Sequence, residues 1–194
     1  MKLVFATQNK NKVDEIKRLI GAQHELLTLA DLDYEEELQE SSLLLEENAL
    51  EKANHIYHEF KMNCFSEDTG LEIDFLNGAP GALSARYAGE EKDANQNMNK
   101  ILKELSGIAN RNARFRTVIA LVIDGKEFLY EGFINGTITT EKKGNNGFGY
   151  DPIFQPEGST KTFAEMNAEE KSAISHRARA FAKMKEFLES EFAE

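Results

Sequence analysis

The chain has 194 residues, of which 41% are hydrophobic and 29% are charged, and these values are typical of a soluble globular protein of one domain. Its formal net charge of −11 argues against broad binding to nucleic acids or membrane surfaces, and no apolar run approaches the roughly 20 residues that span a bilayer. The single cysteine, Cys64, excludes an internal disulfide and favours a reducing compartment such as the cytoplasm.

The N-terminal segment predicts a strand, a polar turn and a helix. Residues 3–6 form a short apolar run, and the polar residues that follow come too early for a signal peptide. Apolar residues then recur at helical spacing from Val13 to Ile20, and Gly21 ends this helix. Such a helix start points backbone N–H groups and a positive dipole end outward. Lys10 and Lys12 oppose that dipole, which indicates that an anion lies nearby.

The next segment predicts a strand, an acidic linker and a second helix. Residues 25–29 form the candidate strand, and residues 31–47 form the linker, whose glutamates favour a solvated face. The amphipathic helix is predicted from Asn48 to Phe60, and it carries Lys52.

A strand predicted at residues 62–66 runs directly into the sequence Glu67-Asp68-Thr69-Gly70. Two carboxylates at a strand end, followed by a hydroxyl and a glycine, suit Mg²⁺, because this hard cation takes oxygen ligands. The alternative is an acidic turn that precedes a further strand at residues 71–74.

The central part of the chain predicts a helix followed by a β-meander. The helix is expected from Asp93 to Gly107. Residues 115–123 are strongly apolar and β-branched, the turn Asp124-Gly125 follows, and residues 127–134 return as a second strand. Ile138 begins a third predicted strand.

The meander leads into a glycine-rich segment, residues 144–153. Three glycines fall within six residues, and glycine serves where the backbone reaches positive φ or where another group comes close. Phe148 and Tyr150 between them suggest that a flat ring comes close, held by stacking and by backbone hydrogen bonds. The alternative is a glycine-rich hairpin turn with two aromatic side chains in the core.

A capping pair at Asn167 and Glu170 predicts a last helix over residues 168–188. Lys171, His176 and Arg177 lie on it but do not share one helical face. A ligand that contacts all three therefore requires a break near residues 172–175, or an approach along the helix start.

These segments together resemble the inosine triphosphate pyrophosphatase family, also called dITP/XTP or non-canonical purine NTP pyrophosphatases. The resemblance covers nearly the whole chain, and the order of the motifs makes it specific. The motifs are Thr7-Gln8-Asn9-Lys10-Asn11-Lys12, Glu47-Asn48-Ala49, Glu67-Asp68-Thr69-Gly70-Leu71, Gly78-Ala79-Pro80-Gly81 with Ser84-Ala85-Arg86-Tyr87, Phe148-Gly149-Tyr150-Asp151-Pro152, and Glu170-Lys171-Ser172-Ala173-Ile174-Ser175-His176-Arg177.

The resemblance implies an α/β fold with an elongated mixed sheet flanked by helices, and two lobes with an active-site cleft between them. Residues 1–194 would form a single nucleoside-triphosphate pyrophosphatase domain that assembles as a homodimer in the cytoplasm. The implied reaction is Mg²⁺-dependent hydrolysis of ITP, dITP or XTP to the monophosphate and pyrophosphate.

The resemblance also implies roles for individual residues. Asp68 would be the catalytic proton acceptor, and Asp68, Glu40 and Glu67 are the candidate Mg²⁺ ligands. The phosphate-binding turn would comprise Thr7, Gln8, Asn9, Lys10, Asn11 and Lys12, with Lys52 and Thr69 as further substrate contacts. The base-binding side would comprise Phe148, Gly149, Tyr150, Asp151, Lys171, His176 and Arg177. Gln8 stands where many members have glycine, so the turn is expected to be less open.

The expected mechanism is in-line attack of an oriented water on the α-phosphorus. Phe148 or Tyr150 would stack on the purine, and His176, Arg177 or a loop N–H would donate to a 6-keto oxygen. Two alternatives remain: a house-cleaning pyrophosphatase with a different base preference, and a nucleotide-binding sensor without catalysis.

Overall fold

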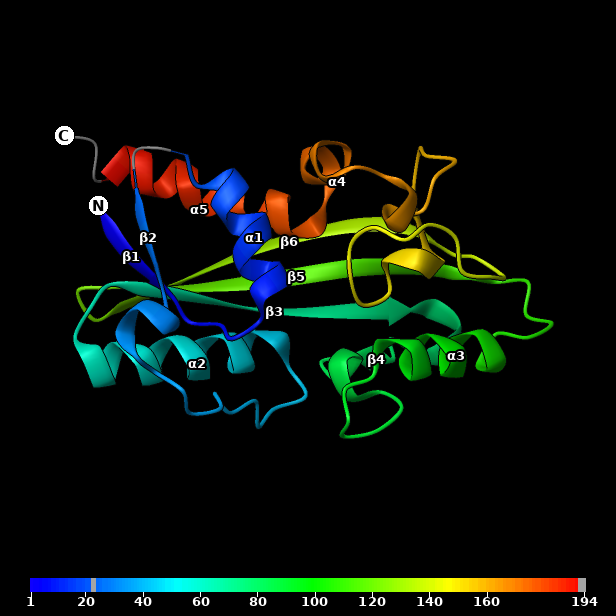
Figure 1. Ribbon diagram of the computed structural model, residues 1–194, viewed down its shortest axis with the longest axis horizontal. Coiled ribbons are helices and arrows are strands. Elements are labelled where there is room, and N and C mark those ends of the chain that lie inside the picture. Colours follow the sequence, from blue (N-terminus) through cyan, green and yellow to red (C-terminus); the bar gives the residue numbers. More distant parts are fainter. Residues whose placement is uncertain (22–23, 192–194) are drawn as a thin grey trace. The chain divides into compact units, whose positions relative to one another are not determined.

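The computed structural model describes residues 1–21 and 24–191, which form a mixed α/β fold in which helices flank a mixed sheet (Figure 1). The strand order is β2-β1-β3-β5-β6-β7, and β4 pairs with β3. The strands are β1 (Lys2–Phe5), β2 (Glu25–Thr28), β3 (Cys64–Ile73), β4 (Pro80–Gly81), β5 (Asn112–Ile123), β6 (Lys126–Ile138) and β7 (Phe154–Pro156).

The α-helices are α1 (Lys10–Leu19), α2 (Leu45–Phe60), α3 (Ala94–Glu104), α4 (Ala168–Ile174) and α5 (His176–Glu191). Short 3-10 helices lie in the connections: η1 (Ala30–Leu32), η2 (Asp74–Leu76), η3 (Ser84–Arg86), η4 (Asp151–Ile153) and η5 (Phe163–Glu165). No helix among the described residues combines the length and the apolar character needed to cross a membrane.

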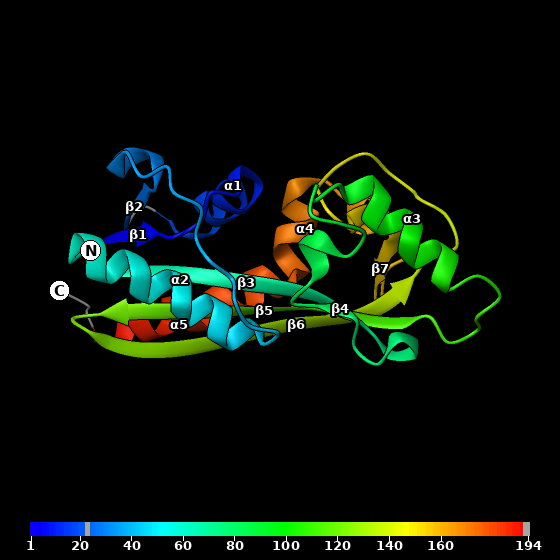
Figure 2. The same cartoon turned by 90° about the horizontal axis from the view of Figure 1, so that it is seen from below.

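The chain forms two compact units, and the first contains residues 1–68, residues 117–132 and the described residues from Arg177 onward. In this unit β1 pairs in parallel with both β2 and β3. Side chains of α1 and α5 pack on one face of these strands in a core that includes Phe5, Ile16, Phe65 and Phe181. Helix α2 runs along β3 (Figures 1 and 2), and the side chains of Cys64 and Ser66 donate to backbone carbonyls of α2.

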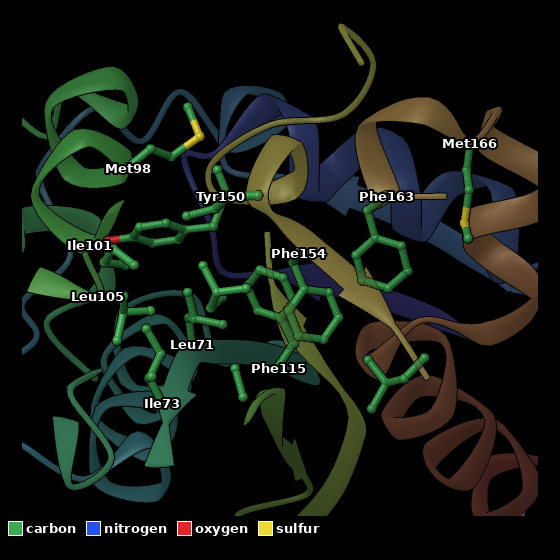
Figure 3. Packing of buried hydrophobic residues seen from close by; sticks show 14 residues of the cluster. Leu71, Ile73, Met98, Ile101, Leu105, Phe115, Tyr150, Phe154, Phe163 and Met166 are labelled. Atoms are coloured by element: carbon green, nitrogen blue, oxygen red, sulfur yellow. The ribbon is translucent and has the colours of Figure 1, made fainter. Parts of the chain in front are cut away.

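The second unit contains Thr69–Arg116 and Phe133–His176 and has its own hydrophobic core. Figure 3 shows this core, to which Met98 and Ile101 of α3 and its C-cap residue Leu105 contribute. The rings of Phe115, Phe154 and Phe163 lie together there, with centroid separations of 4.6–6.1 Å. Tyr150 and Ile153 anchor the glycine-rich segment in this packing.

Two of the expected strand boundaries are wrong. Residues 67–70 are not a turn between two strands but the middle of the continuous strand β3, and residues 135–137 likewise lie within β6. The glycines in these stretches serve close packing between strands. A Cβ on Gly70 would lie 2.7 Å from the carbonyl oxygen of Gly81 in β4, and one on Gly136 would lie 2.4 Å from that of Gln155 in β7.

The helix expectations differ at their boundaries. Helix α2 begins at Leu45, three residues before the expected start at Asn48, and its end at Phe60 is confirmed. The last helix is interrupted at Ser175, whose backbone is extended, with φ −66° and ψ 155°, so that α4 and α5 are separate helices. The Asn167–Glu170 capping box at the start of α4 is confirmed.

Candidate functional site

The turn between β1 and α1 has the expected geometry of a helix start. Asn9 is the N-cap of α1, and its side-chain oxygen accepts a hydrogen bond from the backbone N–H of Lys12 at 3.2 Å. Thr7 Oγ1 accepts from the N–H of Asn9 at 3.2 Å. Lys10 and Asn11 are exposed in the first turn. An anion placed here would meet backbone N–H groups and the positive end of the helix dipole.

Gln8 does not point away from the protein. Its side-chain amide donates to the backbone carbonyls of Glu35 and Glu36, at 3.4 and 2.5 Å, so it ties the turn to the acidic segment that precedes α2. The turn is therefore braced by the side chain of Gln8.

The anion nearest to Lys12 is the carboxylate of Glu67, whose Oε1 lies 3.0 Å from Lys12 Nζ. Both oxygens of Glu67 also accept from Arg177, at 2.7 Å from Nε and 2.9 Å from Nη2, and Arg177 Nη1 donates to Glu15. Burial alone would raise the pKa of Glu67, but the charges of Arg177 and Lys12 outweigh it and hold the pKa well below its usual range. Glu67 is thus ionised and fully engaged.

Asp68 lies in a different set of contacts. Its Oδ2 accepts from the side-chain amide of Asn48 at 2.9 Å, and its Oδ1 lies 3.9 Å from Lys52 Nζ. Lys52 Nζ also contacts Glu40 Oε1 at 2.6 Å and donates to the backbone carbonyl of Glu67 at 2.8 Å. Burial raises the pKa of Asp68 above its ordinary value, although Lys52 and Lys12 oppose this rise.

The adjacent carboxylates are separated by the alternation of the strand. Because Glu67 and Asp68 follow one another within β3, their side chains leave opposite faces of the sheet. Glu67 accordingly meets α1 and α5, whereas Asp68 meets α2. The prediction of two carboxylates at a strand end, and the alternative of an acidic turn, both assumed that the strand stops before Glu67, whereas β3 is continuous through it.

The residues that fit a divalent cation are Glu40 and Asp68. One carboxylate oxygen of each faces the same ammonium group, Lys52 Nζ, so hard oxygen donors converge where a positive charge already lies. In the described part of the chain, no three His, Cys, Asp or Glu side chains gather as a complete metal-binding set. Such a pair suits Mg²⁺, which commonly takes one or two carboxylates and completes its shell with water and substrate phosphate.

The glycine-rich segment in the second unit is organised around Asp151. Its Oδ2 accepts from the backbone N–H of Phe148 at 2.9 Å and from Lys171 Nζ at 2.6 Å. Lys171 Nζ also lies 4.8 Å from the centroid of the Phe148 ring. Gly147 has φ +72°, and a Cβ there would lie 2.0 Å from Asp151 Oδ2. Phe148 and Lys171, expected on the base side, are therefore brought together through Asp151.

Tyr150 and His176 are buried rather than exposed to a ligand. Tyr150 belongs to the hydrophobic core, and its hydroxyl donates to the carbonyl of Ser84 at 2.6 Å. The His176 ring is 3% exposed and stacks on Phe115 with a centroid distance of 4.7 Å and an interplanar angle of 16°. Of the two aromatic side chains in the segment, only Phe148 is partly exposed. Phe148 therefore remains the candidate for stacking on a purine ring, and Tyr150 does not.

The other expected contacts lie near these two groups of residues. Thr69 follows Asp68 on β3 and is partly exposed, and Gly149 has φ +61° with open space where a Cβ would stand. The break at Ser175 allows Lys171 and His176 to belong to the second unit while Arg177, the next residue, belongs to the first. Ser175 lies within residues 172–175, the stretch in which a break was considered.

Sequence reasoning assigned no role to two polar residues of the first unit. Asn48 was seen as part of a motif only, although it precedes Lys52 by four residues and so shares its helix face. Glu15 was not singled out, although it stands three residues after Lys12 on α1 and contacts Arg177. The spacing of Asn48 from Lys52 and of Glu15 from Lys12 could have indicated both residues, because side chains three or four residues apart share a helix face.

Comparison with known proteins agrees with these observations. The family model described as the Ham1 family matches residues 3–187. A protein of Flavobacterium psychrophilum named dITP/XTP pyrophosphatase is 47% identical over 190 residues, which cover 98% of this chain and 100% of that protein. A protein of the same name from Christiangramia forsetii is 49% identical over 188 residues, covering 97% and 99%.

Solved structures give the same result for the fold. The structure of the Staphylococcus aureus Ham1 protein superposes with a TM-score of 0.89 at 35% identity and covers 98% of this chain and 100% of that one. A match of the family model over most of the sequence, near-complete coverage of relatives approaching half identity and a shared fold lead to one conclusion. The chain belongs to the Ham1 family.

Proposed function

We infer that this protein is a dITP/XTP pyrophosphatase, a hydrolase that converts a non-canonical purine nucleoside triphosphate to its monophosphate and pyrophosphate. The observation that carries the inference is 47% identity to a protein of that name over essentially the full length of both chains. The contacts of Asp68 support it, because a buried carboxylate among Lys52, Lys12 and Glu40 suits water activation beside a polyphosphate.

We assign the phosphate side to the first unit. Backbone N–H groups of Lys10 and Asn11 at the start of α1, together with Lys12 and Lys52, would stabilise the negative oxygens of the triphosphate. The positive charges of Lys12 and Lys52 are compensated by the carboxylates of Glu67 and Glu40. An incoming phosphate would compete with these carboxylates for the two ammonium groups. Thr7 and Gln8 would shape the turn.

Asp68 is the proposed proton acceptor. Its buried carboxylate accepts from Asn48 at Oδ2. We assign to Oδ1 the proton of the water that attacks the α-phosphorus in line. Glu40 and Asp68 would hold Mg²⁺, which when bound neutralises phosphate charge and polarises the phosphoryl oxygens. Glu67, also predicted as a ligand, is engaged by Arg177 and Lys12, and we assign it to holding these two cations.

We assign base recognition to Phe148, Gly149, Asp151 and Lys171 of the second unit. Phe148 would stack on the purine, a contact that tolerates any base, while Lys171 or a backbone N–H of this segment would donate to a 6-keto oxygen. Adenine presents an amino group at that position, so a buried donor would be left unpaired. The assembly proposed from the resemblance is a homodimer in the cytoplasm, and light scattering at several concentrations tests the dimer.

The deciding experiment incubates the purified protein with dITP, ITP, XTP, GTP and ATP in the presence of Mg²⁺. The products are separated to distinguish monophosphate plus pyrophosphate from diphosphate plus phosphate. We expect monophosphate and pyrophosphate as products, formed from dITP, ITP and XTP much faster than from ATP or GTP. We also expect the activity to require Mg²⁺ and to be lost when EDTA is added. Turnover limited to modified pyrimidine triphosphates, or nucleotide binding without pyrophosphate release, would overturn it.

A further inference from the structure

The buried side chain of Asn48 joins Asp68 to the chain beside Glu40. It lies in the first turn of α2, is 1% exposed, and makes three side-chain hydrogen bonds. Its Oδ1 accepts from the backbone N–H of Ser42 at 2.9 Å, and its Nδ2 donates to the carbonyl of Ser42 at 3.0 Å and to Asp68 Oδ2 at 2.9 Å. A buried amide with these three partners is a strongly specified structural element.

The contacts also fix the orientation of the amide. The backbone N–H of Ser42 can only donate, and its carbonyl can only accept, so the oxygen and nitrogen of Asn48 cannot be exchanged without two unfavourable contacts. Because Ser42 determines the orientation, the remaining N–H must point at Asp68 Oδ2. An aspartate of the same size would place a second carboxylate against Asp68 and against the Ser42 carbonyl.

The two groups joined by Asn48 are those assigned to the reaction. Ser42 is two residues after Glu40 in the extended chain that precedes α2, here called the Glu40 segment (residues 39–44). Lys52, one helical turn after Asn48, contacts Glu40 Oε1 at 2.6 Å and lies 3.9 Å from Asp68 Oδ1. Asn48 therefore determines which oxygen of Asp68 faces Lys52 and where the backbone beside Glu40 lies.

We propose, on the basis of the function inferred above, that Asn48 is a positioning residue for the hydrolysis. It occupies Asp68 Oδ2 so that Oδ1 faces Lys52 and Glu40, and it ties the Glu40 segment to the same point. The chemistry is performed by Asp68, and Asn48 acts through it. Loss of the amide would leave the substrate contacts at the α1 turn in place but misalign the proton acceptor, which lowers kcat more than it raises KM.

The sharpest variant is Asn48→Asp, which keeps the size of the side chain and the acceptor for the Ser42 N–H but removes both N–H donors. Asn48→Ala removes all three bonds without adding charge, and it replaces the first variant if that one does not fold. The matched control is Glu51→Ala. Glu51 Oε2 accepts from the backbone N–H and the hydroxyl of Ser41, so this control loosens the Glu40 segment without touching Asp68.

The measurements are kcat and KM for dITP, with the folded fraction determined by circular dichroism, and amide hydrogen exchange over residues 39–44 in the free protein. Either Asn48 variant should lower kcat about 10- to 100-fold, the range found when a residue that orients a metal-site ligand is lost, with KM changed less than about threefold. Both Asn48→Asp and Glu51→Ala should accelerate exchange in the Glu40 segment, while Glu51→Ala keeps kcat within about threefold of the wild type.

Two results would overturn the proposal. Equal loss of kcat in Asn48→Asp and Glu51→Ala would show that Asn48 only tethers the segment, and wild-type kcat in a folded Asn48 variant would show that Asp68 needs no such partner. Failure of the proposed function is a separate outcome, because the wild-type protein itself would then release no pyrophosphate from dITP or XTP.

Discussion

Ionisable residues in the first unit are divided between two opposite faces of one strand. Glu67 lies among Lys12, Glu15 and Arg177, and Asp68 lies among Asn48, Lys52 and Glu40. The side-chain oxygens of Glu67 contact Arg177 and Lys12, and Oδ1 of Asp68 lies 3.9 Å from Lys52 Nζ. We expect Glu67 to hold these two cationic side chains in place and Asp68 to receive a proton.

Asp68→Asn tests the second of these roles. The variant keeps the size of the side chain but cannot accept a proton, so kcat for dITP should fall by about 100-fold or more. The melting temperature should not fall, because a neutral amide is easier to bury than a carboxylate. Steady-state kinetics and differential scanning fluorimetry measure the two effects. Asp74→Asn, at an exposed carboxylate, is the control, and near-normal turnover in the Asp68 variant would remove Asp68 from the proposed role.

Glu67→Gln tests the first role through the dependence of stability on pH. Its pKa in the folded protein is below the unfolded value of about 4.3, so its contribution is fully present above that pH and declines as the pH falls. At pH 7 the variant should lose about 3 kcal/mol of unfolding free energy, because Arg177 and Lys12 lose a buried partner.

Below about pH 4.3 the difference between the wild type and Glu67→Gln should narrow by up to about 1.4 kcal/mol per pH unit. Urea unfolding of both proteins at pH 7 and at pH 3.5 measures this difference in unfolding free energy. A difference of the same size at both values would mean that the carboxylate charge of Glu67 does not stabilise the fold.

At the scale of elements, the secondary structure was predicted better than its interruptions. Apolar periodicity identified the helices and most strands, and capping residues marked the start of α4. The strand breaks predicted at residues 67–70 and 135–137 were wrong. Gly70 and Gly136 allow close approach of the neighbouring strands β4 and β7, and this pairing cannot be seen in the local sequence. The same limit hid the opposite orientations of Glu67 and Asp68, since alternation can be applied only once a strand is known to be continuous.

The glycine-rich segment, residues 144–153, is held in shape by the carboxylate of Asp151. Gly147→Ala would force an alanine to φ +72° and place its Cβ 2.0 Å from Asp151 Oδ2, displacing the carboxylate that holds Phe148 and Lys171. Gly158→Ala is the matched control, because its φ is +80° and nothing lies within 4 Å of the added Cβ.

Both glycine variants should lose about 1–2 kcal/mol of stability from the left-handed backbone conformation, and Gly147→Ala should lose more because its Cβ displaces Asp151. Only Gly147→Ala should also raise KM for dITP, by about tenfold, because the base contacts assigned to Phe148 and Lys171 would be misplaced. Equal KM values in the two variants would argue against base recognition by this segment.

At the scale of the whole molecule, three strands have residues in both compact units. β3, β5 and β6 each pass from one unit to the other within a continuous run of strand. A strand shared in this way cannot be lost from one unit while the other keeps its hydrogen-bond ladder intact. We therefore expect the two units to unfold in one cooperative transition.

Cys64 provides a probe of that transition in the first unit. It is buried on β3, its thiol donates to the carbonyl of Ala53, and burial raises its pKa to about 12. The thiolate is the reactive form, so a thiol reagent at pH 8 should modify the protein only as it unfolds. Amide exchange in α3, which packs in the core of the second unit, reports independently on that unit.

With increasing urea, the midpoint of Cys64 labelling and the midpoint of α3 deprotection should coincide. Cys64→Ser, followed by α3 exchange alone, is the control that the probe itself does not shift the transition. Two separated midpoints would show that the strands common to both units do not couple them, and that each unit folds on its own core. Rapid labelling of Cys64 in the absence of urea would instead contradict its assigned burial and its raised pKa.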